Sequence, residues 1–410
     1  MLDIRIGKIY NALMMLFIVG MFNQSIWNQY NWWPILILAF IGFSVFYVYK
    51  THRLKINKIN CGYIAWFLLL CAMILFVSYT CDYTERSLAT FKNFWRVGLY
   101  VVLIVINCRE EKNVRWILKS IWIAGIIMTI YLLMNFDSTA IIAVDVNYAT
   151  STRMGLGGVE HPNTTAYNLF LAYACGFYLL LNKRQYKWPI YLGELVIVLG
   201  CLLTGSRKVL ITIVLLPVLN IILKSKNPLK LTAQIMAVCV IVWGAYELTQ
   251  NNEVLYNLLG HRIEDITGIF SGEDRSASGR NQLISEGLTV AFNNPLGVGL
   301  NCLAYYTYDG AYAHNEYVEI IADLGWVAFL VYYCPILAQV IGLARKSITK
   351  ELFLGDRDYT LYWFTLIIDI LVLSIFQTSF AFFGYHLLLA MFLSRLYEFK
   401  NHCEEEPLLE

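Results

Sequence analysis

Apolar stretches recur along almost the whole of this 410-residue chain, and many are close to the roughly 20 residues that a helix needs to cross a bilayer. The composition agrees, because 58% of the residues are hydrophobic, only 15% are charged, and the mean hydropathy is +0.56. These values exclude an ordinary soluble globular protein. We therefore predict one all-α, polytopic membrane domain that occupies residues 1–410.

The hydropathy pattern predicts about twelve transmembrane helices joined mostly by short connections. The predicted spans are 7–24, 33–49, 61–80, 93–108, 115–135, 163–182, 188–204, 206–223, 231–249, 315–343, 359–376 and 378–396. Two connections are long, at 136–162 and 250–313. No internal repeat is visible, which disfavours folds built from inverted halves.

The distribution of basic residues predicts the orientation in the membrane. If the N-terminus is cytoplasmic, 22 of the 31 Lys and Arg residues fall in cytoplasmic segments. This agrees with the positive-inside rule, and the opposite topology would invert it. We therefore expect both termini in the cytoplasm and both long loops on the extracytoplasmic side of the cytoplasmic (inner) membrane.

Several predicted helix starts on the outer side carry basic or polar residues. Arg153 lies in a glycine-rich stretch ahead of Pro162 and Asn163, where one helix begins, and Arg207 opens another. Helix N-termini offer free N–H groups and a positive dipole end, which favour an anion. If these ends converge, they form an outward-facing anion site. Solvated loop charges and arginines that reach lipid headgroups are the alternatives.

His314 opens the predicted span 315–343 and is followed by Asn315, Glu316, Glu319 and Asp323. The three acids are spaced by three and four residues, so they share one helical face. A lipid-facing stripe of acids is too costly, and the face must contact protein or water. The pattern therefore favours a functional site at this membrane boundary.

The outer loop has structure of its own. Segments 254–266 and 281–292 have helical apolar periodicity and are expected to lie on the membrane surface. Residues 271–280, which include Arg280, are rich in Ser and Gly and predict a flexible stretch. Residues 294–301 predict a turn. Its glycines do not make a nucleotide loop, because the third glycine and the preceding strand are missing.

Together these motifs resemble the O-antigen ligase and O-antigen polymerase family. The resemblance covers residues 150–330. It rests on the Arg153 stretch before Pro-Asn, Thr-Gly-Ser-Arg at 204–207, Ser-Gly-Arg-Asn at 278–281, Asn-Pro-Leu-Gly-Val-Gly at 294–299, and His-Asn-Glu-Tyr at 314–317. It implies a C-type glycosyltransferase-like membrane fold. It also implies glycan transfer from an undecaprenyl diphosphate carrier on the outer face, without nucleotide sugar or metal. We expect no cofactor and no nucleic-acid partner.

The residues fit that chemistry. A diphosphate leaving group needs fixed positive charge, which we assign to Arg207 and Arg280 with Arg153 as a further contact. An acceptor hydroxyl must lose a proton, and His314 is the predicted general base. Asn163, Asn315, Glu316 and Glu319 are predicted to bind substrate, and a carboxylate could instead orient the histidine.

The predicted function is polymerisation of undecaprenyl-diphosphate-linked oligosaccharide repeat units for O-antigen or capsule. Membrane lipid, a chain-length regulator and a flippase are the other expected partners. A ligase that moves finished glycan to another acceptor is an alternative that the motifs do not separate. A flippase, using Asp323, Asp369 and His386, is a second alternative, and a peptidoglycan-type glycosyltransferase is a third.

Overall fold

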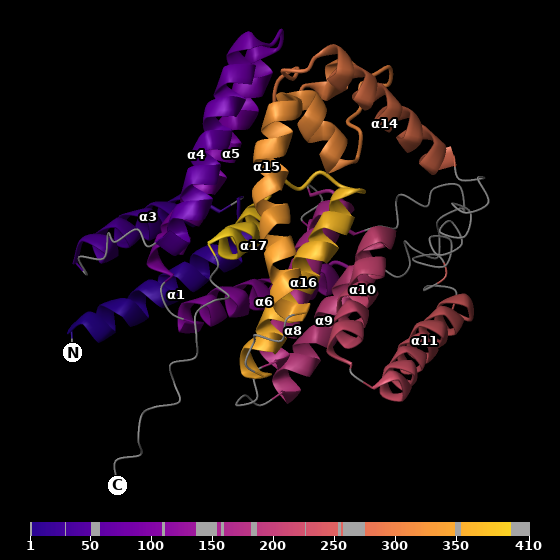
Figure 1. Cartoon of the computed structure of the whole chain (residues 1–410). Helices are drawn as coiled ribbons and strands as arrows, with labels where there is room; N and C mark the ends of the chain where they lie inside the picture. Colours follow the sequence, from indigo (N-terminus) through magenta and orange to yellow (C-terminus); the bar gives the residue numbers. More distant parts are fainter. Residues whose placement is uncertain are drawn as a thin grey trace.

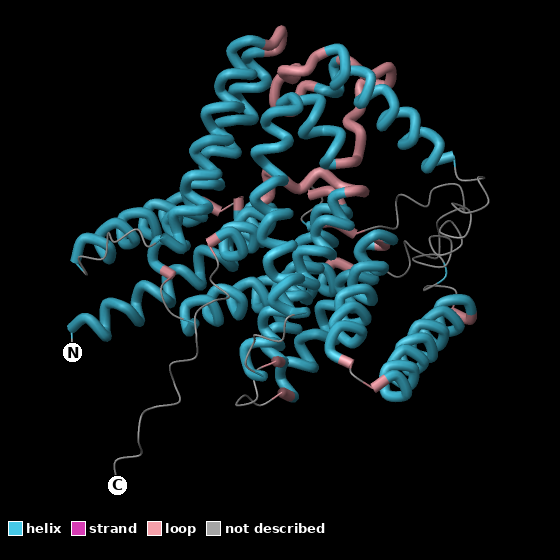
Figure 2. Tube along the Cα trace, in the orientation of Figure 1, coloured by secondary structure: helices cyan, strands magenta, loops and turns pink. Residues whose placement is uncertain are grey.

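A computed structural model describes residues 2–28, 30–50, 58–108, 111–136, 154–156, 160–181, 187–225, 227–252, 256, 275–348 and 354–394. This part of the chain is helical and contains no strand (Figure 2). The all-α prediction is therefore confirmed. The segment predicted at 254–266 lies outside the described residues, Tyr256 excepted.

Each predicted span overlaps a helix (Figure 1), although the described part of the last one, predicted at 378–396, is helical only over Phe383–Leu393. The helices are α1 (Leu2–Phe22), α3 (Trp32–Lys50), α4 (Lys58–Thr80), α5 (Thr84–Asn107), α6 (Glu111–Met134), α8 (Pro162–Leu180), α9 (Trp188–Thr204), α10 (Arg207–Lys224), α11 (Pro228–Gln250), α15 (Glu316–Ile348), α16 (Leu354–Ser374) and α17 (Phe383–Leu393). Shorter or connecting elements are α2 (Gln24–Trp27), α14 (Arg275–Asn293) and the 3-10 turn η4 (Leu303–Tyr305).

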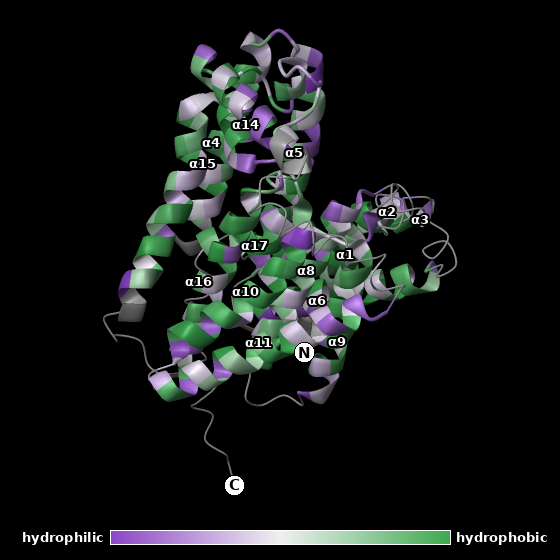
Figure 3. Cartoon of the chain, turned by 90° about the vertical axis from the view of Figure 1, so that its right-hand side faces the viewer, coloured by the Kyte–Doolittle hydropathy of each residue, from purple (hydrophilic) through white to green (hydrophobic). Residues whose placement is uncertain are grey.

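Among the described residues, six helices are long and apolar enough to cross a membrane, namely α3, α4, α5, α6, α11 and α15. Apolar segments of α1, α9 and α17 are shorter. Large apolar side chains are exposed on these helices; Leu38 on α3 is 69% exposed and Ile241 on α11 is 71% exposed. Exposed apolar surface of this extent indicates contact with lipid. Figure 3 shows hydrophobic residues along much of the length of the helices. The chain is a multi-pass membrane protein.

The interior of the bundle is built on close helix contacts at small residues. Helix α6 packs against α1, α8 and α9. A Cβ atom at Gly125 of α6 would lie 2.3 Å from the Ala172 side chain of α8, and one at Gly200 of α9 would lie 2.2 Å from Thr129 of α6. Small residues at such points let backbones approach, which is how helices gain packing energy within a membrane.

Helix α15 is not continuous, contrary to the prediction of an uninterrupted span over 315–343. It breaks at Gly325, whose backbone has φ 83° and ψ 172°. The loop that follows α14 fills the break: the N–H of Val298 donates to the carbonyl of Ala322 at 2.9 Å, and that of Trp326 donates to the carbonyl of Pro295 at 3.2 Å. The Asn-Pro-Leu-Gly-Val-Gly motif thus satisfies backbone groups that the broken helix would leave unpaired.

The start of α14 corrects a second prediction. Residues 275–280 were expected in a flexible stretch, but they form the first turns of α14, so Arg280 lies on a helix. The predicted amphipathic segment 281–292 is helical as expected. Helix α14 packs against α15 and runs across the end of the bundle (Figure 1).

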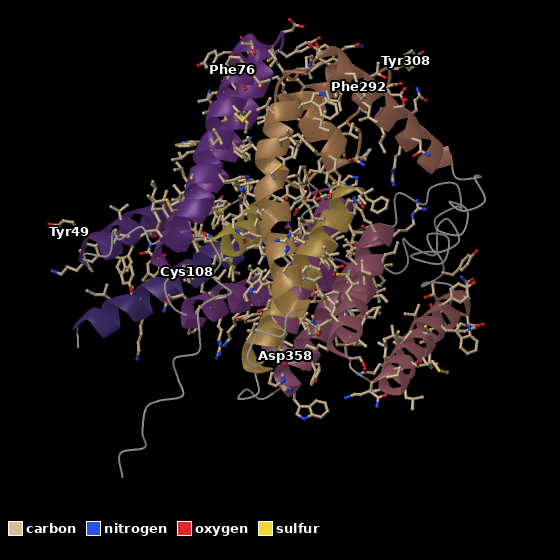
Figure 4. All side chains as sticks on the ribbon, in the orientation of Figure 1. Tyr49, Phe76, Cys108, Phe292, Tyr308 and Asp358 are labelled. Atoms are coloured by element: carbon tan, nitrogen blue, oxygen red, sulfur yellow. The ribbon has the colours of Figure 1, made fainter. Side chains whose placement is uncertain are left out.

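Helices α10 and α16 run antiparallel, and a polar contact joins the two helices at each end. At one end the Lys208 ammonium donates to the carbonyl of Phe376 at 2.9 Å. At the other end Lys224 pairs with Asp358 at 3.0 Å. In Figure 4, Tyr308 of the predicted outer loop and Asp358 lie at opposite ends of the molecule. The two polar contacts therefore mark opposite ends of the α10 and α16 pair.

Candidate functional site

His314 has a left-handed backbone conformation, with φ 56°. This conformation is uncommon for a residue that carries a Cβ atom. The imidazole is half-buried, and its ring centroid lies 3.9 Å from that of Tyr312. The local backbone therefore aims this side chain in a direction that an ordinary extended or helical residue would not give.

Two of the acids that follow His314 hold the loops around it. The Glu319 carboxylate accepts the N–H of Ala313 at 2.5 Å, directly before the histidine. The Asp323 carboxylate accepts the N–H groups of Asn301, Cys302 and Leu303 at 2.6, 3.1 and 2.9 Å. Both side chains are buried. The sequence prediction that this face contacts protein or water is confirmed, and the face anchors the loop that leads to His314.

Glu316 is completely buried and has several partners from the end of α16 and the segment after it. Ser379 donates its N–H and its hydroxyl to one carboxylate oxygen at 2.6 and 2.7 Å. Tyr333 and Ser374 donate to the other oxygen at 3.3 Å each. Asn315 caps α15, because its Oδ1 accepts the N–H of Val318 at 3.1 Å. The structure thus gives Glu316 and Asn315 positioning contacts within the protein.

The N-termini of α8 and α10 meet beside this loop. His161 caps α8 by accepting the N–H of Asn163 at its Nδ1 at 3.2 Å. Ser206, which precedes α10, donates its hydroxyl to Oδ1 of Asn163 at 3.3 Å. Arg207 is the first residue of α10 and is half-buried. The expected convergence of these two helix ends is present. Arg153 lies outside the described residues.

Charges from three elements act on His314. Burial is the largest of the effects that lower the pKa of the His314 imidazole to about 4. The others are the charges of Arg280 on α14, Lys208 on α10 and His161 at the start of α8. Desolvation and nearby cations both disfavour an imidazolium ion. The ring is therefore neutral at physiological pH, and an uncharged ring nitrogen can accept a proton.

A small cavity of about 150 Å³ lies next to this histidine. It is lined by Asn301, Tyr312, Glu319, Asp323, Thr378 and Phe380. Tyr312 belongs both to this lining and to the ring contact with His314. The polar lining residues carry amide, hydroxyl and carboxylate groups, which suit hydroxyl-bearing ligands.

Some features of the site could not be found in the sequence. The sequence assigns no role to Lys208, but its ammonium bonds to a backbone carbonyl and its charge acts on His314. The anchoring role of Asp323 depends on partners 20 to 22 positions away. The sequence indicates this role only through the presence of an acidic residue, Asp323, within an apolar helix.

A family model described as O-Antigen ligase matches residues 192–333. The matched segment runs from α9 into α15 and contains Arg207, Arg280, His314, Glu316 and Glu319. It covers the main part of the region in which the sequence resembles this family, and it confirms the resemblance there. Among curated proteins, none matches the chain.

Proposed function

Residues 192–333 carry an O-antigen ligase family domain, and from this premise we propose that the chain is a polysaccharide polymerase. It joins undecaprenyl-diphosphate-linked oligosaccharide repeat units on the outer face of the cytoplasmic membrane. The polymer becomes O-antigen or capsule, and a flippase and a chain-length regulator are its expected partners.

The reaction needs one proton acceptor and one site for a departing diphosphate. The acceptor sugar hydroxyl loses its proton to His314 while its oxygen bonds to the anomeric carbon of the donor. The bond from that carbon to the diphosphate breaks, and the diphosphate leaves with the electron pair. Arg207 and Arg280, with Arg153 as a further contact, stabilise that charge through bidentate hydrogen bonds. Metal-independent catalysis of this kind depends on fixed cations.

The observation that carries this proposal is a neutral histidine in a left-handed turn with cations of two helices acting on it. A bound diphosphate offsets the charges of Arg280 and Lys208. Because those charges lower the pKa of His314, their neutralisation makes the imidazole a stronger base. Substrate binding therefore raises the basicity of the catalytic group at the moment when it is needed.

The outward placement of the site is part of the proposal. The distribution of Lys and Arg supports it. Both termini then lie in the cytoplasm. The break in α15 does not argue for a transporter, because backbone of the 294–299 loop fills it.

The test is incubation of purified protein with lipid-linked repeat units, followed by gel separation of the products. Wild type should form a ladder of lipid-linked polymer. His314→Asn should lose at least about 100-fold in rate, the usual contribution of a general base. Asparagine tolerates the left-handed backbone, so this variant tests the imidazole rather than the turn.

Arginine variants test the diphosphate site. Arg207→Gln and Arg280→Gln should each slow ladder formation, whereas Arg96→Gln, an exposed arginine on α5, should not. A full ladder from His314→Asn contradicts the assignment of the base. A product that forms only when a non-isoprenoid acceptor is added identifies a ligase. A flippase is identified by two results together. The purified protein transfers glycan to no acceptor, and cells that lack the gene accumulate lipid-linked units on the inner face of the membrane.

A further inference from the structure

A second cavity, of about 230 Å³, lies between α2, the start of α8 and the start of α17. Its polar lining comes from Gln24, Ser25, Asn28, Glu160, Thr164 and Asn168, and its apolar lining includes Phe382. Drug-sized ligands occupy cavities of about 300–1,000 Å³, so this space suits a single ring rather than a whole oligosaccharide.

Glu160 organises the polar wall of this cavity. Its carboxylate accepts the hydroxyl of Ser25 at 3.0 Å and the side-chain amide of Asn168 at 3.3 Å. Burial raises the pKa of the Glu160 carboxyl to about 7, so a proton is available there near neutral pH. One carboxyl group thus links the N-terminal α1–α2 corner to α8 and offers both donor and acceptor positions to a ligand.

The lining has the chemistry of a carbohydrate site. Amides, hydroxyls and a carboxyl match the alternating donors and acceptors of sugar hydroxyls. The rings of Phe22 and Phe383, 6.1 Å apart at their centroids, supply apolar faces for the C–H face of a pyranose. The lining residues of the described chain include no Lys or Arg, so the cavity does not suit a second phosphate.

Two of the lining residues are close in sequence to residues that act on the site around His314. Glu160 directly precedes His161, whose charge acts on His314. Phe382 follows the segment in which Ser379 bonds to Glu316. A sugar held in this cavity therefore lies close to the convergent ends of α8 and α10.

We infer that this cavity is a subsite for one uncharged sugar ring of the lipid-linked oligosaccharide, bound through Gln24, Asn28 and Glu160. The inference rests on the proposed function for the identity of the substrate. The subsite fixes where the glycan lies relative to the diphosphate, and its residues determine which sugar is accepted.

The binding experiment uses His314→Asn protein, in which turnover is blocked, and oligosaccharide released by mild acid from the cell's own lipid-linked repeat units. Saturation-transfer NMR measures the dissociation constant. Gln24→Ala with Asn28→Ala should weaken binding about tenfold, because each lost hydrogen bond contributes a factor of a few. Both side chains are exposed, so the fold tolerates their loss.

Asn31→Ala is the matched control, because Asn31 is an exposed asparagine in the same connection that does not line the cavity. It should leave binding unchanged, and inorganic pyrophosphate should not displace the sugar. Equal affinity of the double variant and the Asn31→Ala control overturns the subsite, and competition by pyrophosphate overturns its assignment to an uncharged ring.

Measurements of polymer formation distinguish a failure of this inference from a failure of the proposed function. If wild type forms no polymer but binds the oligosaccharide through Gln24 and Asn28, the proposed function fails and the subsite stands. If polymer forms with unchanged KM in the double variant, the proposed function stands and the subsite fails. A KM about tenfold higher with kcat changed less than twofold supports both.

Discussion

Two residues other than glycine, Asn301 and His314, have left-handed backbone in the described part of the chain, with φ 59° and 56°. Asn301 is the residue whose N–H bonds most closely to Asp323, and His314 follows the residue whose N–H bonds to Glu319. Each unusual conformation is thus held by a buried carboxylate. Such conformations persist where the surrounding structure determines them, and they cluster at functional sites.

The low pKa of His314 predicts an unusual pH profile. A general base must be deprotonated, so kcat/KM should stay level from pH 8 to about 5 and fall only as the pH drops toward 4. Because bound diphosphate offsets nearby cations, the acid limb of kcat should lie at higher pH than that of kcat/KM. Steady-state rates across this range measure both limbs.

Arg280→Gln provides the internal check on this profile. It removes one of the charges that lower the pKa of His314, so its acid limb in kcat/KM should move to higher pH. Arg96→Gln should leave the limb in place. An acid limb near pH 6.5 in wild type, the ordinary pKa of histidine, contradicts the lowered pKa of the half-buried His314 imidazole.

Asp323→Ala tests the anchoring of the loop before His314. The substitution leaves the N–H groups of Asn301, Cys302 and Leu303 without their acceptor, at a cost of about 1–3 kcal/mol for each donor that stays buried and unpaired. We expect a marked fall in the melting temperature in detergent, together with loss of activity. Asp309→Ala, at an exposed position in the same loop, is the control and should melt like wild type.

At the scale of elements, the break in α15 depends on Gly325. Its φ and ψ lie in a region that is essentially restricted to glycine, and a Cβ atom there would lie 2.5 Å from the carbonyl oxygen of Pro295. Gly325→Ala should therefore destabilise the protein by more than about 2 kcal/mol, a sum of backbone strain and displacement of the 294–299 loop.

Substitution of Gly342, on the same helix, should have the opposite effect on stability. It lies in a helical stretch of α15, and a Cβ atom there meets nothing within 4 Å. Gly342→Ala should stabilise the protein by about 0.5–1 kcal/mol. Thermal unfolding of the two variants side by side measures the difference. Similar melting temperatures for both would show that the break at Gly325 is not a feature of the folded protein.

The helices could be predicted from the sequence, but their interruptions could not. Apolar runs of sufficient length mark spans such as 33–49 whatever their neighbours are. The apolar pattern continues past Gly325 without change, so only the docking of residues 294–299 reveals the break. Residues 275–280 have the composition of a flexible stretch, yet they form the start of α14.

The same distinction holds for the candidate site. Histidine and arginines at helix ends are visible in the sequence, because charged groups are rare in such a chain. Lys208 and Glu160 were not assigned roles, because their contacts with Phe376 and Ser25 join segments more than 100 residues apart. The sequence pattern identifies which residues are unusual, but only the fold determines which of them are in contact.

At the scale of the whole molecule, the contacts at helix ends divide into two sets. Asn163 with Ser206 and Lys208 with Phe376 tie ends that are predicted to be extracytoplasmic, whereas Lys224 with Asp358 ties ends predicted to be cytoplasmic. No contact among these joins a predicted outer end to a predicted inner one. These three contacts agree with the predicted sides of α8, α10 and α16.

Cysteine labelling tests that assignment. Tyr308, which is 89% exposed in the outer loop, and Trp188, which is 82% exposed at the start of α9, are replaced singly by cysteine in a background without the exposed native cysteines. A membrane-impermeant maleimide should label Tyr308→Cys in intact cells and Trp188→Cys only after the membrane is opened. The reverse pattern would place His314 in the cytoplasm, where carrier-linked glycan exported for polymerisation does not reach it. The catalytic assignment would then fail together with the topology, because both depend on the same side of the membrane.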